Sequence, residues 1–208
     1  MIVTIHQIEH ATHLSLFKKF EKVDVIVLGD TFQFKKNYYE NRNKIKANNS
    51  EGWQWITVPV ETHNMKPINE VRIIYKTKWQ HLYLTRLTEI YKDYPYFNDI
   101  YPHIEEIIMN PQPIYISDLN EIILNYTMGC LKIFKPIIKT SDLDLPKNLK
   151  ATDLLVEICK RLGADTYLSG PSGKDYLELE KFGDIKVIFH EKETGLSIYD
   201  YLFTNGAK

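Results

Sequence analysis

The sequence predicts an α/β fold, a Rossmann-like and mostly parallel sheet with a helical insertion at about residues 78–131. Short apolar runs of strand composition alternate with amphipathic helical patterns near both ends of the chain. Between these regions the apolar residues recur at helical spacing. On folding, a chain of 208 residues buries roughly 70 % of the surface that it exposes when unfolded. It therefore needs no metal or disulfide to fold. We therefore expect one α/β domain over residues 1–208, with residues 78–131 as a helical subdomain.

The N-terminal part of the chain predicts a βαβ unit. Residues 2–5 and 23–28 are apolar runs, and Leu14, Phe17 and Phe20 recur at helical spacing between them. A helical crossover joins parallel strands, and the loops that follow parallel strands meet at one edge of the sheet. Polar segments directly after the predicted strands are therefore the first candidates for a site.

The middle of the chain changes from polar to helical. Residues 30–52 are polar, and we expect an ordered functional loop that ends in a turn at residues 48–52. Residues 55–60 and 71–75 have strand composition and either pair as a hairpin or form separate strands. Helical spacing then predicts three helices between residues 79 and 131. Their expected breaks are Pro95, Pro102 and the pair Pro111 and Pro113.

The last third of the chain returns to alternating strands and helices. Thr152 is expected to cap a helix, and Gly163 and Gly206 are expected to follow helix ends. The expected strands are residues 137–138, 166–168 and 187–189, and the expected helices are residues 152–162 and 197–204.

Charge and cysteine content narrow the function classes. The chain has 26 basic and 27 acidic residues, which argues against a non-specific nucleic-acid binder. Its two cysteines, Cys130 and Cys159, lie in helix-like apolar patterns, and no cationic leader precedes an apolar signal core. No apolar run approaches the roughly 20 residues of a spanning helix. We expect a reduced, cytoplasmic protein with no transmembrane segment and no nucleic-acid partner; its oligomeric state stays open.

The sharpest candidate site is the turn GPSGKDY, which follows a late strand. Gly170 and Gly173 permit positive φ and close backbone approach, successive amides can form an anion-binding nest, and Lys174 adds a point charge. This combination suits a phosphate. It is not a P-loop, because Asp175 stands where that motif needs Ser or Thr. The alternative is a plain strand-to-helix turn with Asp175 near a helix N-terminus.

Two other polar segments follow predicted strands. The loop FQFKKNYYENRNKIK combines cations, asparagines and aromatics that suit a phosphorylated sugar or a nucleotide; its alternatives are a solvated basic loop and a surface for single-stranded nucleic acid. The segment IHQIEHATH offers histidines that could hydrogen-bond a ligand or carry a proton, cap a helix or, less favoured, ligate zinc. No nucleophile elbow or triad order is recognisable, so covalent catalysis is not predicted.

Seven segments distributed over the chain carry a family resemblance. They are VTIHQ at 3–7, QFKKNYYENRNKIK at 33–46, GWQWITVPV at 52–60, RLTEIYKDYPYFNDIYP at 86–102, KTSDLDLP at 139–146, EICKRLGADTYLSGPSGKDYL at 157–177 and LSIYDYLFTNG at 196–206. Together they resemble the WbqC-like family of bacterial proteins. The NRN segment and the glycine–lysine turn are the specific parts of this resemblance.

The resemblance implies a cytoplasmic transferase of O-antigen (lipopolysaccharide) or other surface-polysaccharide biosynthesis. Its reaction would attach an acyl or aminoacyl group, with glycyl as one candidate, to the amino group of a nucleotide-linked amino sugar. The alternative is a non-catalytic nucleotide-sugar binding or scaffolding protein of the same pathway. Two positions depart from the family pattern: Ile8 follows His6 and Gln7 where proline is usual, and Gly29 precedes Asp30 where consecutive aspartates are frequent.

A weaker likeness, used as analogy, is to pantothenate synthetase and related nucleotidyltransferase-type ligases. It consists of a first strand ending in histidines, a QF pair after the second strand and a KD turn. On this analogy ATP would contact His6, His10 and Lys174 and activate a carboxylic acid as an adenylate. His6 and His10 are four residues apart and do not align cleanly with that motif. ATP is thus an open possibility, and no cofactor is assigned.

The predicted site contains three catalytic residues, His6, Asp30 and Lys174. Lys174 and its turn would hold a phosphate, Arg42 with a neighbouring lysine would anchor the nucleotide-sugar, and His6 or Asp30 would take the amine proton. His6 and Lys174 are expected to face one cleft, because parallel strands send their following loops to one edge. No metal ligand is predicted. The binding set is Gln7, His10, Gln33, Lys35, Lys36, Asn41, Arg42, Ser169, Gly170, Ser172, Gly173, Asp175 and Tyr176.

Overall fold

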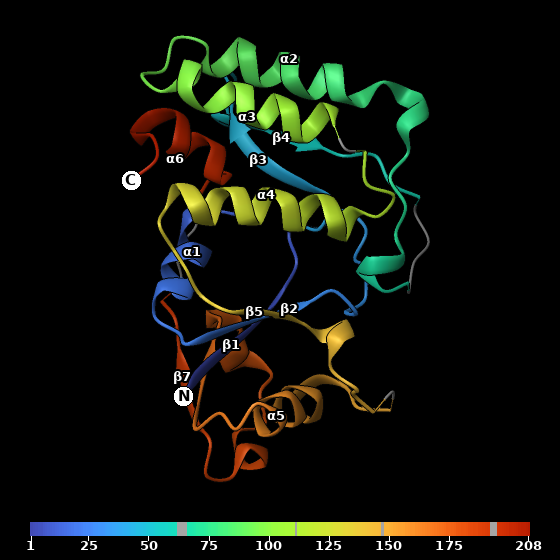
Figure 1. Cartoon of the computed structure of the whole chain (residues 1–208), viewed down its shortest axis with the longest axis vertical. Helices are drawn as coiled ribbons and strands as arrows, with labels where there is room; N and C mark the ends of the chain where they lie inside the picture. The colour runs from blue at the N-terminus through green and yellow to red at the C-terminus, as the bar shows by residue number, and fades with distance from the viewer. Residues whose placement is uncertain (62–65, 111, 147, 192–194) are drawn as a thin grey trace. The chain divides into compact units, whose positions relative to one another are not determined.

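A computed structural model describes residues 1–61, 66–110, 112–146, 148–191 and 195–208. The described part confirms the α/β prediction, with a five-stranded parallel sheet, helices and a separate antiparallel hairpin (Figure 1). The chain divides into two compact units, each described below by itself. Unit 1 comprises Met1–Gln7, Ser15–Thr31 and Phe134–Thr194, and unit 2 comprises Ile8–Leu14, Phe32–Ile133 and Gly195–Lys208. That the whole chain acts as one domain stays a prediction.

Unit 1 contains the parallel sheet, with strand order β5-β2-β1-β6-β7. Its strands are β1 (Ile2–Gln7), β2 (Val25–Gly29), β5 (Ile137–Lys139), β6 (Thr166–Ser169) and β7 (Lys186–Phe189). Each neighbouring pair runs parallel. The chain adds β2 and β5 on one side of β1 and β6 and β7 on the other, so the direction of winding reverses between β1 and β6. This is the order of a Rossmann-type doubly wound sheet.

The sheet of unit 1 is covered on both faces. The side chains of Val3, Ile26 and Val27 are completely buried, as expected for parallel strands with apolar runs. Helices α1 (Leu14–Glu21) and α5 (Ala151–Arg161) lie on opposite faces (Figure 1). Right-handed crossovers in opposite directions from a central strand place their helices in this way. The predicted βαβ unit is therefore confirmed.

The start of α5 differs from the prediction. Thr152 lies inside the helix, and the capping position is Lys150, which makes no side-chain cap hydrogen bond. The Thr152 hydroxyl instead accepts a hydrogen bond from the amide of Glu178 at 3.3 Å. Gly163 follows the helix end as predicted, with a positive φ of 65° that favours glycine.

Unit 2 is mainly helical and contains an antiparallel hairpin. Helices α2, α3 and α4 pack in sequence, and α6 contacts α3 and β3 (Figure 1). The Phe203 ring lies 4.7 Å from Tyr91 and 5.4 Å from Phe97, measured between centroids, and these rings contribute to the core. The elements are β3 (Arg42–Lys46), β4 (Trp53–Thr57), α2 (Trp79–Tyr91), α3 (Phe97–Met109), α4 (Ile116–Cys130) and α6 (Ile198–Asn205).

The predicted loop at residues 30–52 is partly a strand, because β3 pairs with β4. Asn43 and Ile45 are completely buried, whereas their neighbours along β3 are cationic, so the strand has the period-2 alternation of a half-buried sheet. Residues 71–75 do not pair with β4; Ile73 makes an isolated bridge with Val60. The expected turn at residues 48–52 is present and ends in Gly52 with φ 73°.

The predicted helix breaks are correct at Pro95 and wrong at Pro102. Pro95 lies between α2 and α3, but Pro102 lies within α3. A proline near the start of a helix removes one interior hydrogen bond, and the helix continues past it. Pro111 lies outside the described residues. Gly206 ends α6 as predicted, with φ 75°.

Short 3₁₀ helices connect several of these elements. They are η1 (Ile68–Glu70), η2 (Tyr75–Thr77), η3 (Thr140–Asp142), η4 (Pro171–Asp175) and η5 (Leu179–Phe182). Within the described ranges, no helix has the length and apolarity needed to cross a membrane.

Candidate functional site

The carboxyl edge of the sheet in unit 1 brings two of the predicted segments together. β1 pairs with β6 in the register Ile2 with Thr166 and Val3 with Tyr167. The Thr4 hydroxyl also donates to the Leu168 carbonyl at 2.8 Å, so the two strands remain neighbours toward their ends. His6 and Gln7 close β1, and the glycine–lysine turn follows β6. Ligands of doubly wound sheets bind at this edge, where the direction of winding reverses.

The glycines of the turn have a different role from the predicted one. Gly170 has φ −70°, and neither Gly170 nor Gly173 is among the positive-φ residues. Gly173 is required by packing, because a Cβ there would lie 2.1 Å from the Ser169 hydroxyl oxygen. Its amide donates to the Gly170 carbonyl at 3.1 Å, within η4. At least one backbone amide of the expected anion-binding nest is therefore already used within the protein. Recognition of an anion then depends more on side chains.

Lys174 is the accessible cation of this turn. Its side chain is exposed, and its Nζ lies 5.6 Å from the centroid of the Phe189 ring at the end of β7. Ser172, Asp175 and Tyr176 are also exposed, whereas Ser169 is buried. A phosphate at this edge could thus be contacted by Lys174 and the Ser172 hydroxyl without rearrangement of the core.

Asp30 is a structural residue in this arrangement. Its side chain is only 3 % exposed and accepts hydrogen bonds from Thr140 Oγ1 at 2.8 Å, the Ser141 amide at 3.0 Å and Ser141 Oγ at 2.6 Å. These contacts link the ends of β2 and β5. Both carboxylate oxygens are used within the protein, so we do not retain Asp30 as the base that takes an amine proton.

His6 and Gln7 are half-buried at the end of β1, paired in register with Leu28 and Gly29 of β2. They lie at the same edge of the sheet as Asp30 and the glycine–lysine turn, because all of these follow or close parallel strands. That His6 and Lys174 contact one ligand stays a prediction.

His10, in unit 2, is enclosed by the protein. It is completely buried; its Nδ1 lies 2.9 Å from Asn120 Oδ1 and its Nε2 2.7 Å from Tyr83 Oη. Burial lowers the pKa of His10 to about 4, although the hydrogen bond with Asn120 opposes this shift. Both ring nitrogens are used in the core, so His10 takes a structural role instead of the predicted contact with substrate or ATP.

The NRN segment also has structural contacts. The Asn41 amide donates to the Val58 carbonyl at 2.8 Å, and the Asn43 amide donates to the carbonyls of His10 and Ala11 at 3.0 Å. Both asparagines are buried. These bonds link β3 to two neighbouring segments of unit 2, which explains why the motif has this spacing without requiring a ligand.

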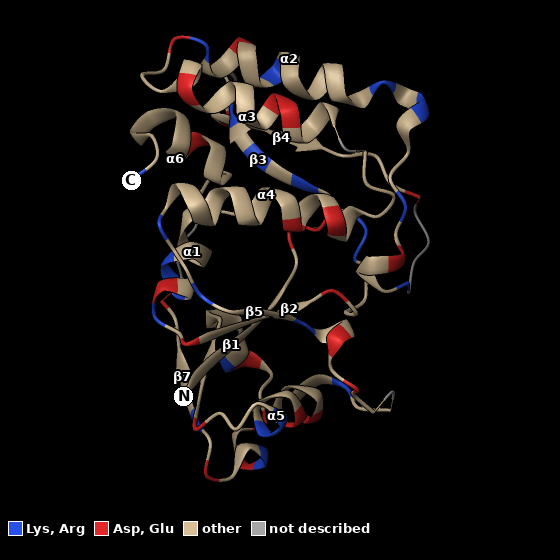
Figure 2. Cartoon of the chain, viewed as in Figure 1, with Lys and Arg blue, Asp and Glu red and all other residues tan. Residues whose placement is uncertain are grey.

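The cations of the hairpin pack against aromatic rings. The guanidinium carbon of Arg42 lies 3.9 Å from the Trp55 ring centroid, and Lys44 Nζ lies 3.6 Å from that of Trp53. Arg42 also donates to the Asn37 carbonyl. Figure 2 shows the basic residues at intervals along β3. Gln33, Lys35 and Lys36 are exposed.

A buried carboxyl that the sequence did not single out is Glu40. It is completely buried, and burial, with a smaller effect from Glu9, raises its pKa to about 7, which Lys35 partly opposes. Its position between two tyrosines and the NRN segment is the only local signal of this environment, since Glu is ordinarily exposed.

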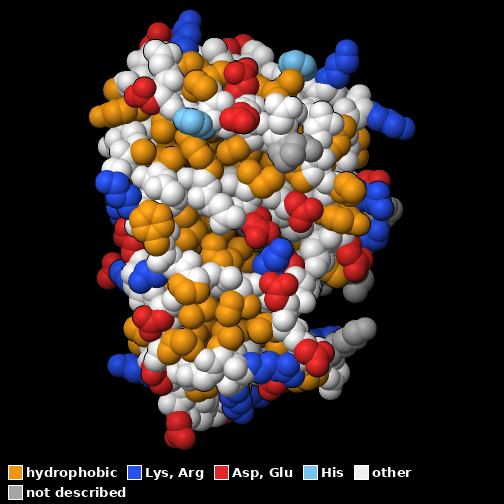
Figure 3. All heavy atoms as spheres, in the orientation of Figure 1, with side chains coloured by type: hydrophobic (Ala, Val, Ile, Leu, Met, Phe, Trp, Pro, Cys, Tyr) orange, Lys and Arg blue, Asp and Glu red, His pale blue; other side chains and the backbone are white. Residues whose placement is uncertain are grey.

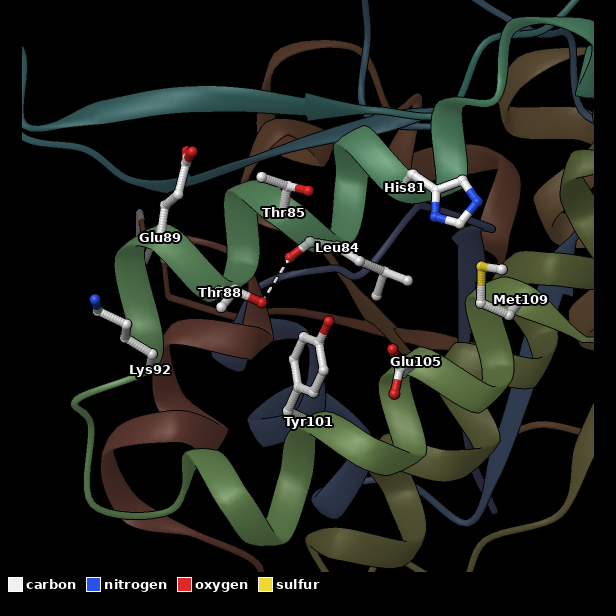
Figure 4. Close-up of a pocket in the computed structure, with 9 residues that line it drawn as sticks. All are labelled: His81, Leu84, Thr85, Thr88, Glu89, Lys92, Tyr101, Glu105 and Met109. Carbon is white, nitrogen blue, oxygen red and sulfur yellow. Dashed lines mark hydrogen bonds between the residues drawn. The ribbon is translucent and has the colours of Figure 1, made fainter.

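Two surface pockets lie away from the predicted residues. One, of about 350 Å³, lies between α2 and α3 in unit 2 (Figure 4). Its polar lining is mostly exposed side chains, with Tyr101 and Glu105 extending from α3 toward α2. The other, of about 490 Å³, is lined by residues that precede β6 and β7, at the amino edge of the sheet in unit 1. Neither pocket includes a predicted site residue.

In the described ranges, no group of three or more His, Cys, Asp and Glu side chains could hold a metal ion. On the face drawn in Figure 3, the described cationic and anionic side chains are interspersed.

Comparison with known proteins assigns the family. Residues 11–208 match the WbqC-like protein family. The chain belongs to this family. The match covers the NRN segment and the glycine–lysine turn, whereas His6, Gln7 and His10 precede the matched residues of this WbqC-like protein.

A curated relative is named "Uncharacterized protein Rv1507c", from Mycobacterium tuberculosis (strain ATCC 25618 / H37Rv). It is 29 % identical over 223 residues, covering 99 % of this WbqC-like chain and 94 % of the relative. That name states no activity. No solved structure matches the chain significantly.

Proposed function

We propose that this WbqC-like protein transfers an acyl or aminoacyl group to the amino group of a nucleotide-linked amino sugar. The observation that carries the proposal is the adjacency of β1 and β6, at the point where the winding of the sheet reverses. Family membership supports the proposal, because the resemblance described above implies a transferase of surface-polysaccharide biosynthesis. The cytoplasm is the compartment proposed for it.

In this proposal the nucleotide diphosphate lies on the turn after β6. Lys174 supplies the positive charge, and Ser172 supplies a hydroxyl, because both side chains are exposed there. A lysine ammonium contacts phosphate oxygens without a fixed orientation, so it suits a diphosphate of variable conformation. Asp175 and Tyr176 stay candidate contacts to the sugar.

His6 is the proposed acceptor of the amine proton in a direct transfer. A histidine titrates close to neutral pH and is the side chain most often used for such a proton. His6 closes β1 at the same edge as the turn, and Asp30, the other predicted base, already accepts three hydrogen bonds.

Binding is tested by calorimetry with UDP and UDP-glucosamine. Lys174→Ala should weaken both by about 10- to 150-fold, which corresponds to about 1.5–3 kcal/mol for a hydrogen bond to a charged group. Lys186→Ala is the matched control, because Lys186 is an exposed lysine that begins β7 at the amino edge of the same sheet. Equal affinity in wild type and Lys174→Ala would remove the phosphate from this turn.

Turnover is tested with UDP-glucosamine as acceptor. The donors are acetyl and glycyl thioesters, and free acetate or glycine with ATP. His6→Asn should abolish amide formation with little loss of UDP-glucosamine affinity, whereas Lys174→Ala should reduce both. Binding that depends on Lys174 but supports no turnover with any donor would favour the nucleotide-sugar binding protein.

A further inference from the structure

Ser15 and His190 meet in unit 1, although 175 positions separate them in the sequence. Ser15 Oγ lies 3.3 Å from His190 Nε2, and the two residues are 7 % and 6 % exposed. Ser15 is the second residue of α1, which follows β1, and His190 directly follows β7. The His190 amide donates to the Ser169 carbonyl at 2.9 Å, which fixes its backbone beside the end of β6.

This pair has the chemistry of an activated nucleophile. A serine hydroxyl becomes nucleophilic when an imidazole nitrogen within hydrogen-bond reach takes its proton, and such contacts are often slightly long without substrate. The first turn of an α-helix leaves backbone amides without intrahelical acceptors, and Ser15 lies in that turn. Such amides stabilise the oxyanion that forms when a hydroxyl attacks a carbonyl.

The low exposure of the pair favours transfer over hydrolysis. An acyl-serine in a site that excludes water can persist until an amine arrives. Ser15 comes after β1 on the chain and His190 comes after β7. Both therefore follow parallel strands at the carboxyl edge of the sheet, which also carries the proposed phosphate turn.

We propose that Ser15 and His190 form an acyl-transfer dyad, in which Ser15 is transiently acylated by an activated acyl donor, an ester, thioester or mixed anhydride. This inference rests on the proposed function and adds a covalent intermediate to it, with His190 in place of His6 as the acceptor of the amine proton. No local spacing in the sequence indicated such a pair, because its members lie near opposite ends of the chain.

The proposed reaction has two balanced steps. In the first, Ser15 Oγ attacks the donor carbonyl, His190 Nε2 takes the hydroxyl proton, the bond from carbonyl carbon to leaving group breaks, and His190 returns the proton to the leaving group. In the second, the sugar amine attacks the acyl carbon and the bond to Ser15 Oγ breaks. The amine proton passes through His190 to Ser15. The sum is donor plus amine giving amide plus the protonated leaving group.

The test uses the full chain and p-nitrophenyl acetate as the acyl probe, so it does not require the natural donor. Wild type should release p-nitrophenolate in a burst and carry one acetyl group, which peptide mass spectrometry should locate on Ser15. Ser15→Ala should carry none at that position. His190→Gln should slow acetylation by on the order of 100-fold or more, the usual contribution of a general base.

Two further variants keep the test decisive if Ser15→Ala folds poorly. Ser50→Ala removes an exposed serine of the turn before β4, away from the proposed site, and should retain acetylation of Ser15. Ser15→Cys should form a thioester that hydroxylamine cleaves. Acetylation of wild type at residues other than Ser15, or equal acetylation of Ser15 in wild type and His190→Gln, would overturn the dyad.

The outcomes separate this inference from the proposed function. Transfer to UDP-glucosamine by folded Ser15→Ala at the wild-type rate would overturn the dyad and leave the transferase in place. Acetylation of Ser15 that depends on His190, without transfer to any amino-sugar nucleotide, would support the dyad while removing the proposed acceptor.

Discussion

Unit 1 and unit 2 use their polar side chains differently. In unit 2, His10 and Asn43 are completely buried and hydrogen-bonded to other parts of the same unit. In unit 1, Lys174 and Ser172 are exposed at the carboxyl edge of the sheet. Among the residues predicted for the site, His10 and Asn41 thus serve the core of unit 2, whereas Lys174 and Ser172 remain available to a ligand in unit 1. Accessibility at the sheet edge, and not the density of polar residues, separates the two.

The difference follows from the cost of burying polar atoms. A polar group taken out of water destabilises the fold unless it finds a partner, so an enclosed histidine or asparagine must be hydrogen-bonded. The His10 network continues from Tyr83 Oη to Tyr199 Oη at 3.2 Å, and the Asn120 amide donates to the Glu40 carbonyl at 2.8 Å. Such a network specifies one packing arrangement, and the removal of one member leaves the others unpaired.

The largest effect is expected for His10→Ala. The change removes a buried ring and the hydrogen bonds that Asn120 Oδ1 and Tyr83 Oη form with it, so the free energy of unfolding should fall by about 3–5 kcal/mol. Urea denaturation measures this loss. His81→Ala, at an exposed position of α2, is the control and should change stability by less than about 0.5 kcal/mol. Similar small losses for both variants would contradict the structural role of His10.

The pH dependence of stability gives a second, slightly smaller effect. The pKa of His10 is lowered from 6.5 to about 4, so the unfolded chain binds more protons and stability should rise between pH 4 and 6.5. The pKa of Glu40 is raised from 4.5 to about 7, so the folded state binds more protons and stability should fall between pH 4.5 and 7. Each contribution is about 3 kcal/mol, and the two oppose each other in wild type.

Single variants should reveal the opposing contributions. His10→Gln should lose the rise that His10 contributes, so its unfolding free energy should decrease relative to wild type between pH 4 and 6.5. Glu40→Gln should show the reverse, an increase relative to wild type between pH 4.5 and 7. Urea denaturation at a series of pH values measures both slopes. Parallel curves for wild type and the two variants would show that neither group titrates as described.

Gly173→Ala should have an intermediate effect and tests the packed part of unit 1. The new Cβ would lie 2.1 Å from Ser169 Oγ and 2.9 Å from Leu177 Cδ1, so the turn must shift. Overpacking of this kind costs about 1–3 kcal/mol. Gly170→Ala is the matched control, because no atom lies within 4 Å of its Cβ position. Thermal denaturation should show a lower melting temperature for Gly173→Ala than for Gly170→Ala. Equal melting temperatures would show that the steric constraint does not lie at Gly173.

The sequence predicted the parallel sheet well because its strands are short apolar runs. It failed at β3, where Asn43 is a polar residue on the buried face and the exposed face is cationic, so the strand resembled a basic loop. The helices of unit 2 were predicted from their apolar spacing, but the inclusion of Pro102 in α3 was not.

The candidate site was predictable only in part. The order of strands and helices indicated that the loops after β1 and β6 share an edge, and this needs no side-chain detail. The partners of Asp30 in η3 and the approach of His190 to Ser15 depend on packing between distant segments, more than 100 residues apart in each case. Local spacing carries no information about such pairs.

Arg42→Lys is expected to have the smallest effect on stability. It tests whether a cation of the hairpin in unit 2 serves the fold or contacts a ligand. The sequence indicated a two-pronged contact to a nucleotide-sugar, whereas the structure stacks the guanidinium on Trp55 at 3.9 Å and directs it to the Asn37 carbonyl. Lysine keeps the charge but loses the planar stacking, which is worth about 0.5–1 kcal/mol at an accessible site. We therefore expect a small loss of thermal stability and an unchanged affinity for UDP-glucosamine, with exposed Lys36→Ala as the control for charge. Weaker ligand binding at unchanged melting temperature would instead make Arg42 a ligand contact, and polar residues of unit 2 would then also belong to a binding surface.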